Sequence, residues 1–136
     1  MYLVDTSVWI SYLRKENIPC TIYFKKILDH RLSFGMTSII YQEILQGARS
    51  NADFTLLSDY LGGQRFYHPK SLILTHQAAA EIYFKCRQQG ITIRSTIDCL
   101  IAQIAIEHNL TLLHNDRDYT QIASIIPQLT LANLSE

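Results

Sequence analysis

The sequence has no excess of charge of either sign, because 12 Lys and Arg residues balance 12 Asp and Glu residues. A chain without a net positive field does not attract nucleic acid over its whole surface, so any contact with nucleic acid has to be local. The chain also has no apolar run long enough to span a membrane, and the charge at Asp5 interrupts the apolar segment that a secretory signal would need. These features predict a soluble, cytoplasmic protein that makes no membrane contact.

Cysteine is scarce and is not arranged in metal-binding or redox motifs. Cys20, Cys86 and Cys99 are odd in number and lack the C-x-x-C spacing of zinc and redox sites. We therefore expect reduced thiols in the core, as in cytosolic proteins. The P-loop and the G-x-G-x-x-G pattern of nucleotide-binding sites are absent as well. With 136 residues, of which 48% are hydrophobic, the chain is predicted to fold as a single domain over residues 1–136.

Residues 1–9, MYLVDTSVW, combine a short apolar run with a carboxylate at its end. The β-forming residues 2–4 predict a buried strand, and the helical spacing of apolar residues from Val8 onward predicts a helix immediately after Asp5. In open α/β sheets, ligands bind at the edge where strands end and helices begin. Asp5 is therefore a candidate active-site carboxylate, although helix capping would explain an Asp at this position equally well.

The rest of the chain alternates helical and strand-like segments, which is typical of an α/β fold with a mostly parallel sheet. Apolar periodicity and start or stop residues predict helices over residues 19–29, 38–47, 51–61 and 74–89, a helix whose apolar stripe runs from Ile97 to Ala105, and a helix after residue 116. They predict strands over residues 32–36, 65–68 and 110–113.

The predicted helix over residues 38–47 carries Glu43 on its apolar stripe, together with Ile40 and Ile44, rather than on its solvated face. An ionised carboxylate among isoleucines is costly unless a cation or a hydrogen-bond donor meets it. Glu43 is therefore a second candidate site residue. The structural alternative is that its side chain tilts to the rim of the helix.

Residues 93–119 carry two further carboxylates in informative places. Asp98 stands three residues after Ser95, which is the spacing of a capping box and provides a purely structural explanation. Asp116 follows the predicted strand at residues 110–113 and precedes a helix, which repeats the arrangement at Asp5. If the two strands are neighbours in a parallel sheet, Asp5 and Asp116 share one crevice, though each could instead be a cap alone.

Four carboxylates thus lie at the ends of elements or on inward stripes: Asp5, Glu43, Asp98 and Asp116. Two like charges about 4 Å apart cost on the order of 4 kcal/mol at an effective dielectric near 20, so an ionised cluster requires a cation. Oxygen ligands without Cys or His favour Mg²⁺ or Mn²⁺ over Zn²⁺. Such a metal polarises a phosphoryl oxygen and lowers the pKa of bound water, which suits phosphodiester hydrolysis.

Four segments together resemble the PIN-domain ribonucleases, and most closely the VapC toxins of bacterial toxin–antitoxin pairs: MYLVDTSVW, the helix bearing Glu43, RSTIDCLIA and LLHNDRDY. The resemblance runs the length of the chain and implies a three-layer α/β/α fold with a central, mostly parallel sheet. It also implies that the four carboxylates form an acidic quartet around Mg²⁺, with Mn²⁺ able to substitute and Asp118 a possible additional ligand. The sequence departs from the common form of the last motif at His114, where many relatives have Thr. His114 then either substitutes as a donor or plays no part.

The same resemblance has implications for activity and partners. It implies a magnesium-dependent endoribonuclease that forms a homodimer, cleaves structured RNA such as transfer or ribosomal RNA, and acts as the toxin of a toxin–antitoxin pair. The cognate antitoxin would silence it and would bind DNA with its other end, so contact with DNA is expected only through the antitoxin.

Other classes of protein fit the sequence less well. Phosphatases of the haloacid dehalogenase type carry D-x-D after the first strand, whereas position 7 here is Ser7, and phosphate-receiving regulatory domains need a Lys that residues 110–118 lack. The remaining alternative is a non-catalytic RNA- or protein-binding module of the same fold. Retention of all four acids argues against this alternative, because a degenerate site would first lose the charges that are costly without metal.

Overall fold

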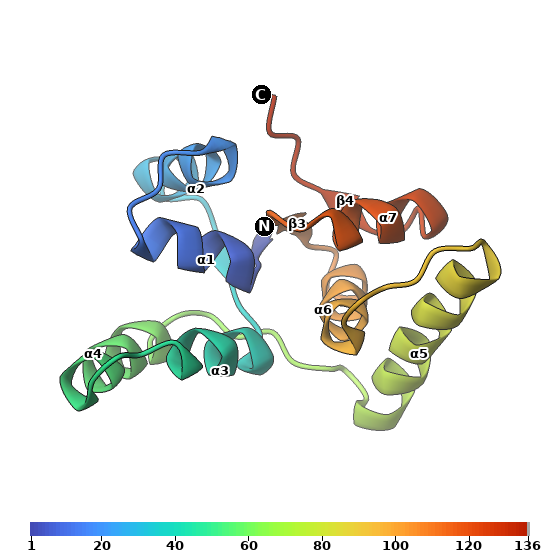
Figure 1. The fold of residues 1–136 in the computed structure, drawn as a ribbon, viewed down its shortest axis with the longest axis horizontal. Coiled ribbons are helices and arrows are strands. Elements are labelled where there is room, and N and C mark those ends of the chain that lie inside the picture. Colours follow the sequence, from blue (N-terminus) through green and yellow to red (C-terminus); the bar gives the residue numbers. More distant parts are fainter. Residues whose placement is uncertain (136) are drawn as a thin grey trace.

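The computed structural model describes residues 1–135 and alternates helices with short strands (Figure 1). The strands are β1 (Tyr2–Val4), β2 (Phe34–Gly35), β3 (Thr111–Leu113) and β4 (Thr130–Leu131). The helices are α1 (Thr6–Leu13), α2 (Pro19–Asp29), α3 (Ser38–Gln46), α4 (Asn51–Gly62), α5 (Leu72–Gln88), α6 (Thr96–Glu107) and α7 (Arg117–Ile125). The predicted α/β class is confirmed.

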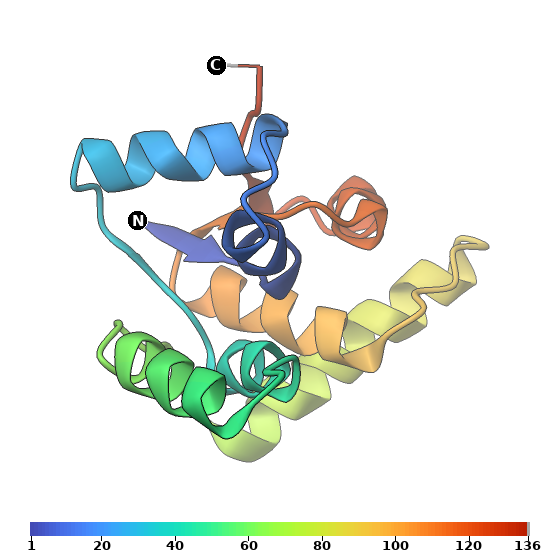
Figure 2. The ribbon, with the colours of Figure 1, turned by 60° about the vertical axis from the view of Figure 1, so that its left-hand side comes forward.

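The four strands pair in parallel, in the order β2-β1-β3-β4. β1 and β3 are neighbours, which is the condition under which Asp5 and Asp116 share one crevice, and Val4 pairs with Leu113 at the carboxyl ends of the two strands. Both strands are fully buried at Leu3, Val4, Leu112 and Leu113, as expected for a parallel sheet with helices on both faces. Figure 2 shows α2 on one side of β1 and α6 on the other, which matches the predicted three-layer α/β/α arrangement.

The predicted strand at residues 65–68 is wrong. This segment runs beside the end of β2 but joins it only through one bridge, between Met36 and Phe66. The His68 carbonyl accepts instead from the imidazole of His108, with His108 Nε2 at 2.7 Å, so the backbone leaves the sheet at this point. The approach to β2 is close, since a Cβ on Gly35 would lie 2.7 Å from the Arg65 carbonyl oxygen.

Other elements also differ from the sequence-based prediction. β2 is limited to Phe34–Gly35 rather than residues 32–36, and α5 begins at Leu72, two residues before the predicted start. Sequence patterns do not predict β4, because two residues are too few for alternation to be detected. The glycine expected after α5 is confirmed at Gly90, whose φ of +79° lies in the left-handed region that glycine tolerates.

An aromatic cluster holds α1 and α2 against the sheet. The Trp9 and Phe24 rings meet edge to face with centroids 4.9 Å apart, and Phe24 packs in the same way on Phe34, 5.4 Å away. Trp9 and Phe24 are fully buried, so this contact fixes α1 and with it the turn that carries Asp5.

Glu107, at the end of α6, fixes the start of α5. Its carboxylate accepts from the Lys70 backbone N at 2.8 Å and from the Thr75 hydroxyl at 2.9 Å. The contact holds α5 against α6, whose first turn contains Asp98.

The three cysteines are free and buried, as predicted: Cys20, Cys86 and Cys99. Within residues 1–135, none of the helices combines the length and the apolar character needed to cross a membrane.

Candidate metal centre

Asp5 follows β1 and is both the N-cap of α1 and a buried carboxylate, with 5% of its surface exposed. Its Oδ2 accepts from the Ser7 backbone N at 3.0 Å and from the Ser7 hydroxyl at 2.6 Å. Ser7 Oγ accepts in turn from the Asn115 backbone N at 2.9 Å, and the Asp5 backbone N donates to the Leu113 carbonyl at 2.9 Å. The turns after β1 and β3 therefore meet at one edge of the sheet.

Tyr119 connects Asp5 to Asp98 across this edge. The phenol hydroxyl lies 2.8 Å from Asp5 Oδ1 and 3.3 Å from Asp98 Oδ1, and Tyr119 itself is fully buried. The capping box expected at Ser95 and Asp98 does not form, because the Ser95 side chain makes no cap hydrogen bond. The structural explanation for Asp98 is thereby removed, and its carboxylate turns toward the other acids.

Burial and like charges raise the pKa of Asp98 from 3.8 to about 7. Desolvation is the largest cause, and the carboxylates of Asp116, Asp5 and Asp118 follow in that order, while the Tyr119 hydrogen bond acts in the opposite direction. Burial also raises the pKa of Tyr119 well above 10, so its hydroxyl stays protonated and donates. Asp98 is thus the carboxylate that gains most from a nearby cation.

Asp116 and Asp118 lie on the same side of the crevice, although two residues this far apart within a helix would point to different sides. One oxygen from each of Asp98, Asp116 and Asp118 can be chosen so that all three atoms lie within 4.8 Å of one another. The physical reason is that Asp116 is the N-cap of α7 with extended φ and ψ of −139° and 122°, so helical periodicity does not apply to it. Its Oδ1 accepts from the Asp118 backbone N at 2.9 Å, which draws the two side chains together.

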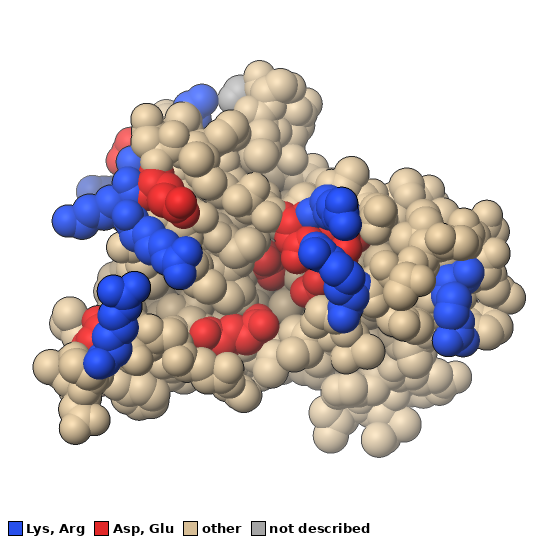
Figure 3. Space-filling model, in the orientation of Figure 1, with Lys and Arg blue, Asp and Glu red and all other residues tan. Residues whose placement is uncertain are grey.

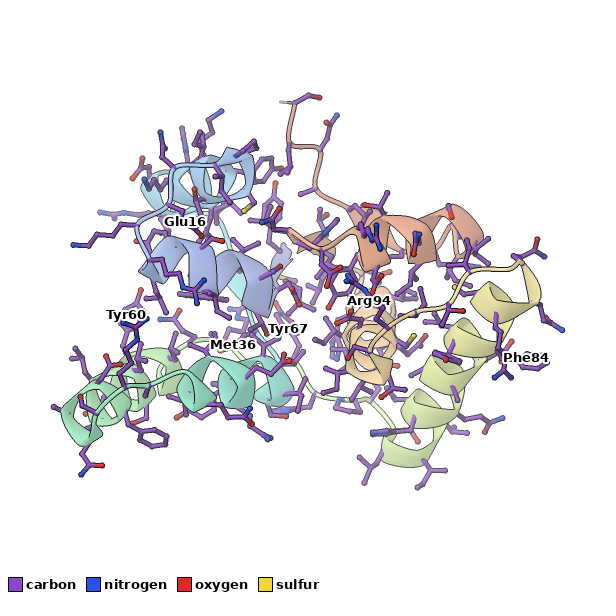
Figure 4. All side chains as sticks on the ribbon, in the orientation of Figure 1. Glu16, Met36, Tyr60, Tyr67, Phe84 and Arg94 are labelled. Carbon is purple, nitrogen blue, oxygen red and sulfur yellow. The ribbon has the colours of Figure 1, made fainter. Side chains whose placement is uncertain are left out.

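Asp118 is 2% exposed and is neutralised by Arg94, from the loop between α5 and α6. Arg94 Nε lies 3.3 Å from Asp118 Oδ2, and Arg94 Nη2 lies 3.2 Å from Asp116 Oδ1. Asp118, and to a smaller extent Asp116, raises the pKa of the Arg94 guanidinium. Figure 4 shows Arg94 between α6 and α7, and Figure 3 shows basic side chains lying against the central acidic patch.

Glu43 lies outside the group of three carboxylates that can converge on one point. It is half-buried on α3, and its Oε1 accepts from the Thr6 hydroxyl at 2.7 Å. Thr6 follows Asp5 directly, so Glu43 contacts the turn that carries Asp5. Glu43 also borders a groove of about 370 Å³ between α1 and the helices α3 and α4.

The PIN domain family model matches residues 2–125 of this chain. The chain belongs to the PIN-domain family. Ribonuclease VapC11 of Mycobacterium tuberculosis is 35% identical to it over 126 residues, which cover 92% of this chain and 93% of that protein. A VapC ribonuclease of Mycobacterium bovis matches with the same identity and coverage.

Solved structures of toxin–antitoxin complexes share the fold of this PIN domain. VapBC2 from Rickettsia felis, bound to a DNA fragment from their promoter, has a TM-score of 0.71 at 23% identity, with 97% of both chains covered. VapBC-1 from nontypeable Haemophilus influenzae has a TM-score of 0.72 at 21% identity, with 99% of this chain and 98% of that one covered. The similarity to these chains establishes the fold alone.

His114 supports the last turn of the site in this PIN domain. Its Nδ1 accepts from the Asp116 backbone N at 3.1 Å, and burial lowers the pKa of the imidazole, which favours the neutral form that such an acceptor requires. Because Nδ1 accepts this hydrogen bond, the proton of the neutral ring is on Nε2, which is the nitrogen that can donate. The ring also packs against Tyr119, with centroids 5.2 Å apart.

The raised pKa of Asp98 predicts a specific dependence of stability on pH when no divalent cation is present. The folded protein holds the Asp98 proton more tightly than the unfolded chain does, so this stabilisation is complete below pH 3.8 and is lost as the pH rises through about 7. The variant Asp98→Asn has no carboxyl group at this position to ionise, so it does not lose this stabilisation as the pH rises. Above pH 7 in chelator, we expect the variant to be more stable than the wild type by about 1 kcal/mol after allowance for solvent screening, or roughly 3–6 °C in Tm.

Thermal melts between pH 5 and pH 8 test this expectation. The difference in Tm between Asp98→Asn and wild type should grow up to about pH 7 and then level off, whereas the exposed Asp59→Asn on α4 should show no such trend. A difference that does not depend on pH would show that Asp98 ionises like an ordinary surface carboxylate.

Proposed function

We propose that this chain is a divalent-metal-dependent endoribonuclease and the toxin of a toxin–antitoxin pair. The observation that carries the proposal is the convergence of Asp98, Asp116 and Asp118 at the carboxyl edge of the sheet, beside the buried Asp5. Membership of the PIN-domain family and 35% identity to relatives named VapC ribonucleases support the activity.

The proposed metal ligands come from Asp5, Asp98 and Asp116, with Asp118 added and Glu43 as a further member of the site. The residues fit a hard cation, because every donor is a carboxylate oxygen, and such a set favours Mg²⁺ or Mn²⁺. The raised pKa of Asp98 supports the fit, since a cation offsets the repulsion that keeps this group partly protonated. A bound cation would polarise a phosphoryl oxygen and lower the pKa of an attacking water.

The polar side chains around the acids fix their positions. Tyr119 holds Asp5 and Asp98 with one hydroxyl, and Ser7 fixes the other oxygen of Asp5. These bonds preset the carboxylates before substrate arrives, which lowers the reorganisation needed during the reaction. In the proposed hydrolysis, water attacks the phosphorus in line with the 3'-oxygen, the P–O3' bond breaks, and the 3'-oxygen leaves and takes up a proton. The RNA 2'-hydroxyl is not the nucleophile, and the products carry 5'-phosphate and 3'-hydroxyl ends.

A cleavage assay with single carboxamide variants tests the activity. We expect Asp98→Asn and Asp116→Asn each to lose at least about 100-fold in cleavage rate, because each removes a negatively charged ligand. Asp59→Asn, an exposed carboxylate on α4, should retain full activity. Chelator should stop the reaction, and Mg²⁺ or Mn²⁺ should restore it.

Sequencing the ends of the cleaved RNA provides the deciding result. Ends with 5'-phosphate and 3'-hydroxyl are expected. A 2',3'-cyclic phosphate formed equally well in chelator would contradict the metal mechanism, and binding of RNA without any cleavage would favour the non-catalytic module.

The proposed protein partner is an antitoxin, and the groove beside Glu43 is suited to one of its segments. Apolar side chains of Leu13, Ile44 and Leu56 line this groove, and Arg14 and Arg49 stand among them. An amphipathic segment seated there would end close to the acidic crevice. Two fold neighbours are named as VapBC complexes, which supports a partner of this kind.

We expect the antitoxin to place an Arg or Lys on the acidic crevice, because a guanidinium can pair with two carboxylates at once. Inhibition should then weaken as the Mg²⁺ concentration rises, and replacing the basic residue of the antitoxin with Ala should also weaken inhibition. Inhibition measured over a Mg²⁺ titration checks both points. If inhibition is indifferent to Mg²⁺ and to the basic residue, the antitoxin blocks the RNA site from elsewhere.

A further inference from the structure

Arg94 lies on the carboxylates that the proposed cation would need. Its guanidinium spans two acids, with Nε 3.3 Å from Asp118 Oδ2 and Nη2 3.2 Å from Asp116 Oδ1. These two acids belong to the group of three whose oxygens can converge within 4.8 Å. A cation bound to that group and the guanidinium in its present position therefore compete for the same carboxylates.

Arg94 and Asp118 differ sharply in burial, so separating them has a different cost for each side chain. The Asp118 side chain is 3% exposed, whereas that of Arg94 is 63% exposed. A buried carboxylate without a counter-charge is costly, but an exposed guanidinium loses little when it swings into solvent. Asp118 thus needs a positive charge at all times, while Arg94 is free to leave whenever another cation takes its place.

The main chain supports such an exchange. The Arg94 backbone N also lies 3.3 Å from Asp118 Oδ2, so this carboxylate keeps one donor after the side chain leaves. The loop position of Arg94, between α5 and α6, places the released guanidinium at the rim of the crevice.

We propose that Arg94 and the divalent cation exchange on Asp116 and Asp118, and that the released guanidinium binds the phosphate of the RNA beside the cut. In the cation-free protein, Arg94 is the counter-charge that keeps the acids together. When a cation occupies the acids, the guanidinium pairs with two phosphate oxygens, which its planar fork fits better than the ammonium of Lys does. The inference rests on the proposed nuclease function and assigns a substrate-binding residue to it.

The exchange predicts that removing Arg94 strengthens metal binding in the absence of RNA. In calorimetric titrations with Mn²⁺ alone, Arg94→Ala should bind about three- to tenfold more tightly than wild type, as expected for the loss of two partly exposed ion pairs. Arg117→Ala is the matched control, because it removes a neighbouring positive charge that makes no ion pair among residues 1–135. Its affinity should change by less than about twofold, since the charge is exposed and screened.

Two further measurements use the same variants. In chelator, Arg94→Ala should melt below wild type and show a larger rise in Tm on addition of Mn²⁺. At saturating Mn²⁺, the KM of Arg94→Ala for RNA should be severalfold higher than that of wild type. The KM of Arg94→Lys should lie between these two values, because an ammonium cannot bridge two phosphate oxygens in the same plane.

The outcomes separate this inference from the proposed function. If wild type binds Mn²⁺ and cleaves RNA, but Arg94→Ala binds Mn²⁺ no more tightly than Arg117→Ala, the exchange is wrong and the nuclease assignment stands. If wild type neither binds Mn²⁺ nor cleaves RNA, the proposed function fails and the exchange fails with it.

Discussion

Repulsion between carboxylates held at one edge of a parallel sheet is the constraint on which the rest of this site depends. At 4.8 Å, the limit of the separation between oxygens of Asp98, Asp116 and Asp118, two unit charges repel by about 3–4 kcal/mol at an effective dielectric near 20. The protein limits this cost in two ways. Asp98 has a pKa raised to about 7, and Arg94 places one positive charge against the other two acids.

The fold creates the repulsion because it brings distant segments to one point. β1 and β3 lie side by side in parallel, so the residues that follow them, Asp5 and Asp116, reach the same edge. α6 presents Asp98 to that edge, and the hydroxyl of Tyr119, which is 114 residues from Asp5 in the sequence, contacts both Asp98 and Asp5. The repulsion between these carboxylates lowers the stability of the fold, and packing of the core does not require it. Such a destabilising arrangement is typical of a functional site.

Much of this arrangement is predictable from local sequence. The run that ends at Asp5 and the run that ends before Asp116 each predict a buried strand, and two such strands side by side in parallel predict a shared crevice. The helix caps are also predictable, and the structure shows that capping and membership of the site are compatible: Asp5 accepts from the Ser7 backbone N and from Tyr119 with different oxygens.

Contacts between distant segments and short elements are the parts that sequence patterns do not reveal. Tyr119 lies on the apolar stripe of α7, so its local sequence does not distinguish it from a core aromatic residue. Arg94 lies in a loop, where an exposed Arg is ordinary. Helical periodicity does not reveal that Asp116 and Asp118 lie together, because α7 begins one residue after Asp116. Residues 65–68 resemble a strand in sequence, but their backbone contacts Met36 through a single bridge and the imidazole of His108, which lies 40 residues further along the chain.

The measurement that tests the central claim most directly is the anomalous scattering of Mn²⁺ in crystals of this protein soaked or grown with the ion. We predict a peak roughly 2 Å from carboxylate oxygens of Asp98 and Asp116, with Asp118 or Asp5 completing the protein ligands. A crystal at saturating Mn²⁺ with no peak in this crevice, or with its strong peak at an acidic group elsewhere, would contradict the assignment of these carboxylates as a metal centre.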